Sequence, residues 1–126
     1  MISVLLVDDS SLMRKAIADL LKTDPEIRLV AEAVNFGQTI ELITKLHPRV
    51  VVIDLHMGDE NKVEPSRVRS CLNGSRLLAI SWNDDETKML AKSLGAVALL
   101  DKLNLANELI PAIKQYANQP DARSWP

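Results

Sequence analysis

Three aspartates have the residue type and the spacing to do chemistry: the pair Asp8-Asp9 and the single Asp54. The apolar run 2–7 (ISVLLV) ends at the pair, and the run 50–53 (VVVI) ends at Asp54. Short runs of Val, Ile and Leu are typical of strands buried on both faces. Ligands of an open parallel sheet bind beyond the carboxyl ends of its strands. If the two strands are neighbours, three carboxylates converge at one edge of a sheet.

Such a cluster of like charges is costly unless something compensates for it. Two charges about 4 Å apart repel each other by roughly 4 kcal/mol at an effective dielectric constant near 20. Raised pKa values, wide spacing or a bound cation would each lower this cost. Hard oxygen ligands suit Mg²⁺, so we expect a cation site. Taken singly, each aspartate could also be a solvated cap of a helix or turn.

The composition is that of one globular domain with an aliphatic core. The 126 residues are 47% hydrophobic, 25% charged and only 3% aromatic. The formal net charge is −2 and no run of Lys or Arg exceeds two residues, so we expect no nucleic acid binding by this domain. Cys71 is the only cysteine, which excludes an intramolecular disulfide and fits a reducing compartment. Without a leader-like start or a run of about 20 apolar residues, we expect a cytoplasmic chain with no membrane contact.

Strand and helix patterns alternate five times along the chain. The expected strands cover residues 3–7, 28–34, 50–54, 76–81 and 96–100, and the expected helices cover 11–22, 36–46, 64–72, 86–94 and 108–117. Residues 57–63 read as a polar loop, and residues 83–85 as the cap of the fourth helix. Pro111 cannot donate to a helical carbonyl, so we favour a late start of the last helix with Asn107 as its cap over a start near Asn104.

Five strand-helix units with short connections predict a parallel sheet with helices on both faces. The expected fold is α/β, a flavodoxin-like (βα)5 doubly wound parallel sheet with strand order 2-1-3-4-5. In this order the first and third strands are adjacent at the switch point, where their aspartates meet. We expect residues 1–118 to form the domain. Residues 119–126, with two prolines and no periodicity, would be a flexible tail or the start of a linker.

Four segments carry a resemblance to a known family. LLVDDSSLMRKAI, VVVIDLHM, LLAIS and GAVALLDK resemble the landmarks of the receiver domain of two-component response regulators. The resemblance covers residues 2 to about 117, and its motifs are specific in combination rather than singly. The segment RLVAEAVNFGQTIELI is most similar to receivers of the NarL/FixJ type, which usually precede a helix-turn-helix DNA-binding domain. No such domain lies within these 126 residues.

The resemblance implies a metal site and an acceptor. Asp54 would be the phosphoacceptor and, together with Asp9, a direct ligand of Mg²⁺, with Mn²⁺ as an alternative ion. Asp8 would hold a coordinated water, and the backbone carbonyl of His56 would be the remaining protein ligand. The His56 side chain itself is expected to line the loop without binding the metal.

Two further residues would contact the transferred group. Ser81 would donate a hydrogen bond to one phosphoryl oxygen, and Lys102 would pair with another. The resemblance implies transfer from a histidine kinase or phosphotransfer protein to Asp54, and a change in the face formed by the fourth helix, fifth strand and fifth helix. That face would signal to a downstream effector domain or protein, or form a homodimer. The chain would be a signalling switch, often in transcription regulation, and not a free-standing enzyme, although Asp54 could gain and lose phosphate without a partner.

Four positions depart from the family pattern. Gly58 and Leu103 stand where proline is usual, which predicts a more mobile loop and a trans Lys102-Leu103 bond, and places the reach of Lys102 in question. Leu99 replaces an aromatic residue. Trp82 replaces Ala or Gly, and would either wall off the acceptor or serve as a contact for a partner.

These departures favour an alternative, a protein-binding module with the receiver fold that works without phosphorylation. The presence of Asp8, Asp9, Asp54 and Lys102 argues against this alternative. A phosphatase with an Asp nucleophile ranks last, because no second aspartate stands two residues after Asp54 to act as an acid.

Overall fold

The computed structural model describes residues 1–56, 63–82 and 85–119. Its strands are β1 (Ile2–Val7), β2 (Ile27–Ala33), β3 (Val50–Asp54), β4 (Arg76–Ser81) and β5 (Ala96–Asp101). Its helices are α1 (Ser11–Leu21), α2 (Phe36–Leu46), α3 (Pro65–Cys71), α4 (Asp85–Ser93), a 3₁₀ turn η1 (Lys102–Asn104) and α5 (Leu105–Ala117). The sheet is parallel with the order β2-β1-β3-β4-β5, which confirms the predicted fold class and strand order.

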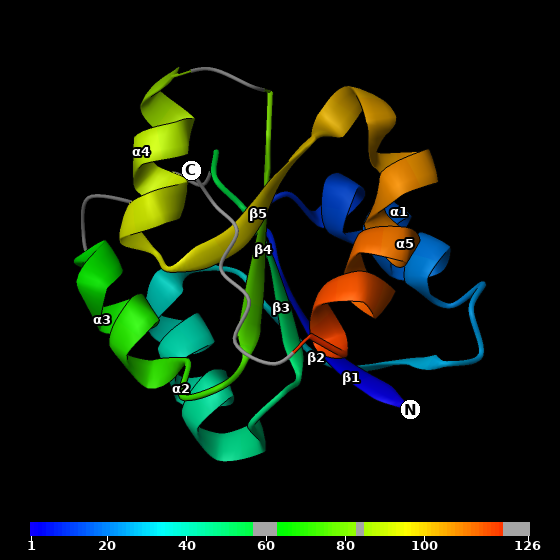
Figure 1. Ribbon diagram of the computed structural model, residues 1–126, viewed down its shortest axis with the longest axis horizontal. Coiled ribbons are helices and arrows are strands. Elements are labelled where there is room, and N and C mark those ends of the chain that lie inside the picture. The colour runs from blue at the N-terminus through cyan, green and yellow to red at the C-terminus, as the bar shows by residue number, and fades with distance from the viewer. Residues whose placement is uncertain (57–62, 83–84, 120–126) are drawn as a thin grey trace.

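The sheet separates two layers of helices. α1 and α5 cover one face, and α2, α3 and α4 cover the other (Figure 1). Alternate strand residues therefore enter different cores: Val4 and Leu6 of β1 pack with α1 and α5, whereas Leu5 and Val7 pack with α2 and α3. Because both faces are covered, β1 and β3 are apolar almost throughout, and the polar side chains that follow them are confined to the sheet edge.

Local capping follows the sequence closely. Ser10 caps α1 by accepting from the backbone N–H of Met13 at 3.2 Å, and Asn35 caps α2 by accepting from Gln38 at 2.8 Å. α2 ends at His47, whose φ of 47° is left-handed. Asn73 and Gly74 form the expected turn with positive φ values of 42° and 97°. None of the described helices is both long enough and apolar enough to cross a membrane.

The late start predicted for the last helix is wrong. α5 begins at Leu105 with Asn104 as its cap, and Pro111 lies inside the helix with its ring exposed. Leu105 packs in the core between α1 and the sheet. Burial of a leucine contributes about 1.5–3 kcal/mol, and this offsets most of the roughly 3 kcal/mol that a proline costs in a helix interior.

The other boundaries differ from expectation by at most one residue at an element's end. Three predictions fall wholly or mostly outside the described residues. They concern the loop 57–63 with Gly58, the capping positions Asn83 and Asp84, and the tail 119–126.

Candidate functional site

Asp8 and Asp54 are brought together by the register of two neighbouring strands. Val7 of β1 pairs with Ile53 of β3, so the two aspartates follow at the same level of the sheet. Both are buried, with exposed fractions of 0% for Asp8 and 4% for Asp54. Two of the three carboxyl groups predicted to converge therefore meet at the carboxyl edge.

Asp54 is held by donors from two directions. Nζ of Lys102 lies 3.0 Å from Oδ2 of Asp54, and the backbone N–H of His56 donates to Oδ1 at 3.0 Å. Lys102 follows β5, where the backbone N–H of Leu103 donates to the Asp101 side chain at 2.9 Å. The described part of the chain has no cis peptide bond, so the Lys102-Leu103 bond is trans, as expected. Lys102 therefore reaches Asp54 although Leu103, not proline, follows it.

Asp8 is only half satisfied. Its Oδ1 accepts from the backbone N–H of Ser10 at 2.9 Å, whereas its buried Oδ2 has no hydrogen-bond partner within the described residues. Burial, and secondly the negative charge of Asp54, raise the pKa of Asp8 to about 6. Arg14 holds the loop by donating to the backbone carbonyl of Asp8 at 3.0 Å and pairing with Glu32.

The two buried carboxyl groups fit a small divalent cation. An orphaned carboxylate oxygen beside a second carboxylate is a hard, negatively charged donor set of the kind that Mg²⁺ prefers. Asp9, which is also a predicted ligand, is exposed. Within the described ranges, no three His, Cys, Asp or Glu side chains gather closely enough to hold a metal ion. The structure thus buries two of the three carboxylates side by side, whereas Asp9 is exposed.

Ser81 lies at the end of β4, beside β3, and its hydroxyl is engaged. Oγ of Ser81 donates to Oγ1 of Thr87 at 2.7 Å, and Nε2 of His56 lies 3.4 Å away. Most of the loop that the His56 side chain was predicted to line falls outside the described residues. Sequence reasoning missed Thr87. Its spacing from Leu90, Ala91 and Leu94 puts it on the apolar stripe of α4, which is the pattern that could have identified it.

Trp82 and Leu99 occupy the positions that depart from the family pattern. The indole of Trp82 is 56% exposed, and its ring centre lies 5.2 Å from Nζ of Lys102, within range of a cation–π interaction. The ring therefore contacts the lysine that holds Asp54 while keeping a face to solvent. Leu99 is half-buried against the core on the α2, α3 and α4 side.

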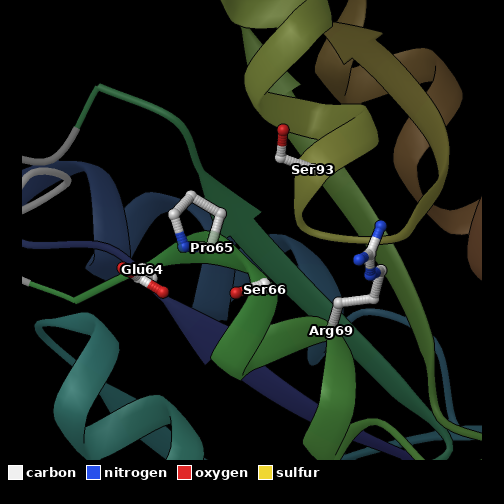
Figure 2. A pocket seen from close by; sticks show the side chains of 5 residues that line it. All are labelled: Glu64, Pro65, Ser66, Arg69 and Ser93. Carbon is white, nitrogen blue, oxygen red and sulfur yellow. The ribbon is translucent and has the colours of Figure 1, made fainter.

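A cleft of about 310 Å³ between α3 and α4 contains none of the predicted site residues. Figure 2 shows its lining side chains, which are Glu64, Pro65, Ser66, Arg69 and Ser93. Gly95 lets Arg69 lie across its wall, because a Cβ at residue 95 would stand 2.7 Å from Cγ of Arg69 and the φ of 80° also favours glycine.

Comparison with known proteins identifies a family and several relatives. The response regulator receiver domain family matches residues 4–114. A protein-glutamate methylesterase/protein-glutamine glutaminase from Methanococcus maripaludis is 35% identical over 80% of this chain, but the match spans only 28% of that protein. The transcriptional regulatory protein DegU from Brevibacillus brevis is 30% identical over 92% of this chain and 50% of its own length. The chain thus spans half or less of these two relatives.

Solved structures agree with the sequence matches. The response regulator domain of Thermotoga maritima CheB superposes with a TM-score of 0.82 at 26% identity, covering 95% of this chain and 98% of that one. The receiver domain of Mycobacterium tuberculosis NarL gives a TM-score of 0.81 at 24% identity, covering 94% and 98%. The structural neighbours thus include a NarL receiver, the type that the segment RLVAEAVNFGQTIELI resembles, and also a CheB receiver. The chain belongs to the receiver domain family of response regulators.

Proposed function

We propose that this receiver domain is a Mg²⁺-dependent phosphorylation switch of a two-component system, with Asp54 as the phosphoacceptor. The observation that carries the proposal is the setting of Asp54: a buried carboxylate at the end of β3, held by Lys102 and the backbone of His56, beside the orphaned oxygen of Asp8. Family membership supports this function, since receiver domains serve two-component signalling.

In the proposed reaction a carboxylate oxygen of Asp54 forms a bond to phosphorus, while the bond from phosphorus to a histidine nitrogen of the donor breaks and that nitrogen keeps the electron pair. Lys102 moves from the free carboxylate to a phosphoryl oxygen, because its ammonium is a mobile point charge. The hydroxyl of Ser81 donates a hydrogen bond to a second phosphoryl oxygen. Mg²⁺, when held by Asp9, Asp54, the carbonyl of His56 and a water on Asp8, would offset the charge of the carboxylates and the phosphoryl group.

The second part of the proposal concerns how the domain passes its signal to an effector. We propose that residues 1–118 act as one cytoplasmic receiver unit that signals through the face of α4, β5 and α5 to an effector domain or protein, without turning over a separate substrate. The domain itself would not bind nucleic acid. Relatives that include a methylesterase and a transcriptional regulator support a signalling role without selecting one effector.

Intact mass tests the acceptor directly. The chain is incubated with acetyl phosphate and Mg²⁺, alongside Asp54→Asn and a wild-type sample with EDTA. We expect the wild type to gain one phosphoryl group that neutral hydroxylamine removes, as an acyl phosphate requires. Asp54→Asn should gain none, and EDTA should slow the gain by about tenfold or more.

Asp19→Asn is the matched control, because Asp19 is an exposed aspartate paired with Lys15 on α1. It should be phosphorylated like the wild type. A mass gain that persists in Asp54→Asn would assign the acceptor elsewhere. No gain in the wild type would favour the alternative, a binding module with the receiver fold that works without phosphate.

A further inference from the structure

Thr87 is a buried polar residue to which the proposed reaction gives no role. It lies in the first turn of α4, and its Oγ1 accepts the hydroxyl proton of Ser81 at 2.7 Å. This distance is typical of a well-formed O–H···O hydrogen bond. Ser81 ends β4, the strand next to the one that carries Asp54. The bond therefore joins the edge of the acceptor site to α4.

We propose that Thr87 is a positioning residue that couples the phosphorylation state of Asp54 to the position of α4. The inference rests on the proposed function, because it needs a phosphoryl group on Asp54. A serine hydroxyl has one proton to donate. In the structure that proton is donated to Thr87. A charged phosphoryl oxygen is a stronger hydrogen-bond acceptor than a neutral hydroxyl. When Ser81 donates to the phosphoryl group, its hydrogen bond to Thr87 therefore breaks.

The loss of this bond matters because α4 is held by few buried side chains. Only Thr87 and Ala91 are buried among its nine residues, whereas α5 buries Leu105, Leu109, Ala112 and Ile113. The hydrogen bond from Ser81 is thus one of the few fixed points between α4 and the sheet. When it breaks, the first turn of α4 is free to shift, and this turn is part of the proposed signalling face.

The proposal also predicts that loss of the Thr87 hydroxyl raises the affinity of the acceptor site for a phosphoryl mimic such as beryllofluoride. Thr87 competes with the phosphoryl group for the proton of Ser81. Removal of the Thr87 hydroxyl should free Ser81 for the phosphoryl group, although Nε2 of His56 at 3.4 Å remains nearby. The gain should be about fivefold in affinity, the size expected for one ordinary hydrogen bond.

The experiment uses the full chain labelled with ¹⁵N, and beryllofluoride with Mg²⁺ as the probe. Backbone amide shifts are followed in two groups: the acceptor loop around Asp54 and His56, and α4 from Glu86 to Ser93. The variants are Thr87→Val, which keeps the shape without the hydroxyl, and Thr87→Ser, which keeps the hydroxyl. Thr44→Val is the matched control, because the hydroxyl of Thr44 only donates to Ile40 within exposed α2 surface.

Wild type, Thr87→Ser and Thr44→Val should respond in both groups. Thr87→Val should respond in the acceptor loop at about a fivefold lower probe concentration, while its α4 response falls to about half or less, because α4 is already released in the free protein. Its free α4 amides should resemble those of the loaded wild type. If Thr87→Val does not fold, Thr87→Ala provides the same comparison with less crowding.

An α4 response and an affinity equal to the wild type in Thr87→Val would overturn the coupling. So would failure of Thr87→Ser to restore both, since that would show a packing role for the methyl group. If the wild-type acceptor loop itself does not respond, while the protein remains folded, the proposed function fails and the coupling fails with it. If the acceptor-loop amides respond in every variant and the α4 amides of Thr87→Val behave as in the wild type, the coupling fails while the proposed function stands.

Discussion

The two edges of the sheet are built on opposite principles. At the carboxyl edge, Asp8 and Asp54 are buried side by side, and one oxygen of Asp8 has no partner within the described residues. At the amino edge, charged side chains are matched with backbone acceptors. Arg49, at the start of β3, donates to the carbonyl of Ala117 at 2.7 Å, and Arg76 of β4 donates to the carbonyl of Gln119 at 2.7 Å.

These arginines close the C-terminal end of α5 against the sheet. The last carbonyl groups of a helix lack partners within the helix and are stabilised by nearby cations. Arg49 also donates to the side chain of Asn118 at 3.1 Å, and its backbone N–H donates to Oγ of Ser3 at 2.9 Å. The amino edge thus holds β1, β3, β4 and α5 together, whereas the carboxyl edge keeps repulsion between carboxylates that a cation can relieve.

The comparison predicts first that the carboxyl edge destabilises the metal-free protein at neutral pH. The pKa of Asp8 is about 6 in the folded chain, against an ordinary value of 3.8. Since the folded pKa is raised, the stabilising contribution is complete below about pH 3.8 and is lost as the pH rises through 6. The loss should reach about 3 kcal/mol, the free energy of a shift of roughly two pKa units.

Urea unfolding with EDTA between pH 4.5 and 8 measures the part of this loss that falls above pH 4.5, about 2 kcal/mol. Asp8→Asn cannot ionise, so its free energy of unfolding should exceed that of the wild type across this range, by an amount that is largest above about pH 6.5 and shrinks toward pH 4.5. The exposed aspartate variant Asp19→Asn should keep the wild-type slope. If the free energies of unfolding of wild type and Asp8→Asn change with pH in parallel, ionisation of Asp8 does not destabilise the carboxyl edge.

Addition of Mg²⁺ should reverse the effect for the wild type. At tenfold excess over its dissociation constant, binding to the folded state alone adds about 1.4 kcal/mol at pH 7.5, and less at pH 5 because protons compete for Asp8. Asp9→Asn should lose most of this gain if Asp9 turns inward to bind the metal. A full gain in Asp9→Asn would leave Asp8 and Asp54 as the only side-chain ligands.

The second prediction concerns the amino edge. Arg49→Ala should lower the free energy of unfolding by about 1 kcal/mol, because it removes two charge-assisted hydrogen bonds from a partly solvated side chain. The change should be the same at pH 5 and pH 8 and with or without Mg²⁺. Arg28→Ala is the control, since Arg28 is exposed and makes no side-chain hydrogen bond within the described residues. A pH-dependent loss in Arg49→Ala would mean that the two edges are not independent.

Sequence reasoning predicted the fold well because burial on both faces leaves a clear pattern. The runs ISVLLV and VVVI are apolar because they contact helices on both sides, and their strands fall within one residue of expectation. The start of α5 was predicted wrongly because a local rule about Pro111 was given more weight than the burial of Leu105, which depends on α1 and the sheet.

The site divides in the same way. The convergence of Asp8, Asp54, Ser81 and Lys102 follows from strand ends alone, since each residue closes or follows a central or neighbouring strand. The outward placement of Asp9, the bond from Ser81 to Thr87 and the contact of Trp82 with Lys102 depend on loop conformation and rotamers. These features have no sequence period, so only the structure shows them.

The third prediction has the smallest effect and concerns Trp82 at the boundary of the carboxyl edge. Its ring lies over Lys102 and is more than half exposed. We expect a ring in this position to narrow access to Asp54 without enclosing it. Trp82→Ala should speed both phosphoryl gain from acetyl phosphate and its later hydrolysis by about two- to fivefold, the size of an exposed cation–π contact of roughly 0.5–1 kcal/mol. Time courses of intact mass measure both rates.

Two variants decide what the indole does. Trp82→Phe keeps an aromatic face over Lys102 and should stay closer to the wild type than Trp82→Ala. Met89→Ala removes another exposed apolar side chain, on α4, and should leave both rates unchanged. If Trp82→Ala and wild type have equal rates, the ring does not limit access, and its exposed face is better explained as a contact for a partner. A rate increase in gain but not in hydrolysis would show that Trp82 restrains Lys102 before transfer rather than shielding the acyl phosphate from water.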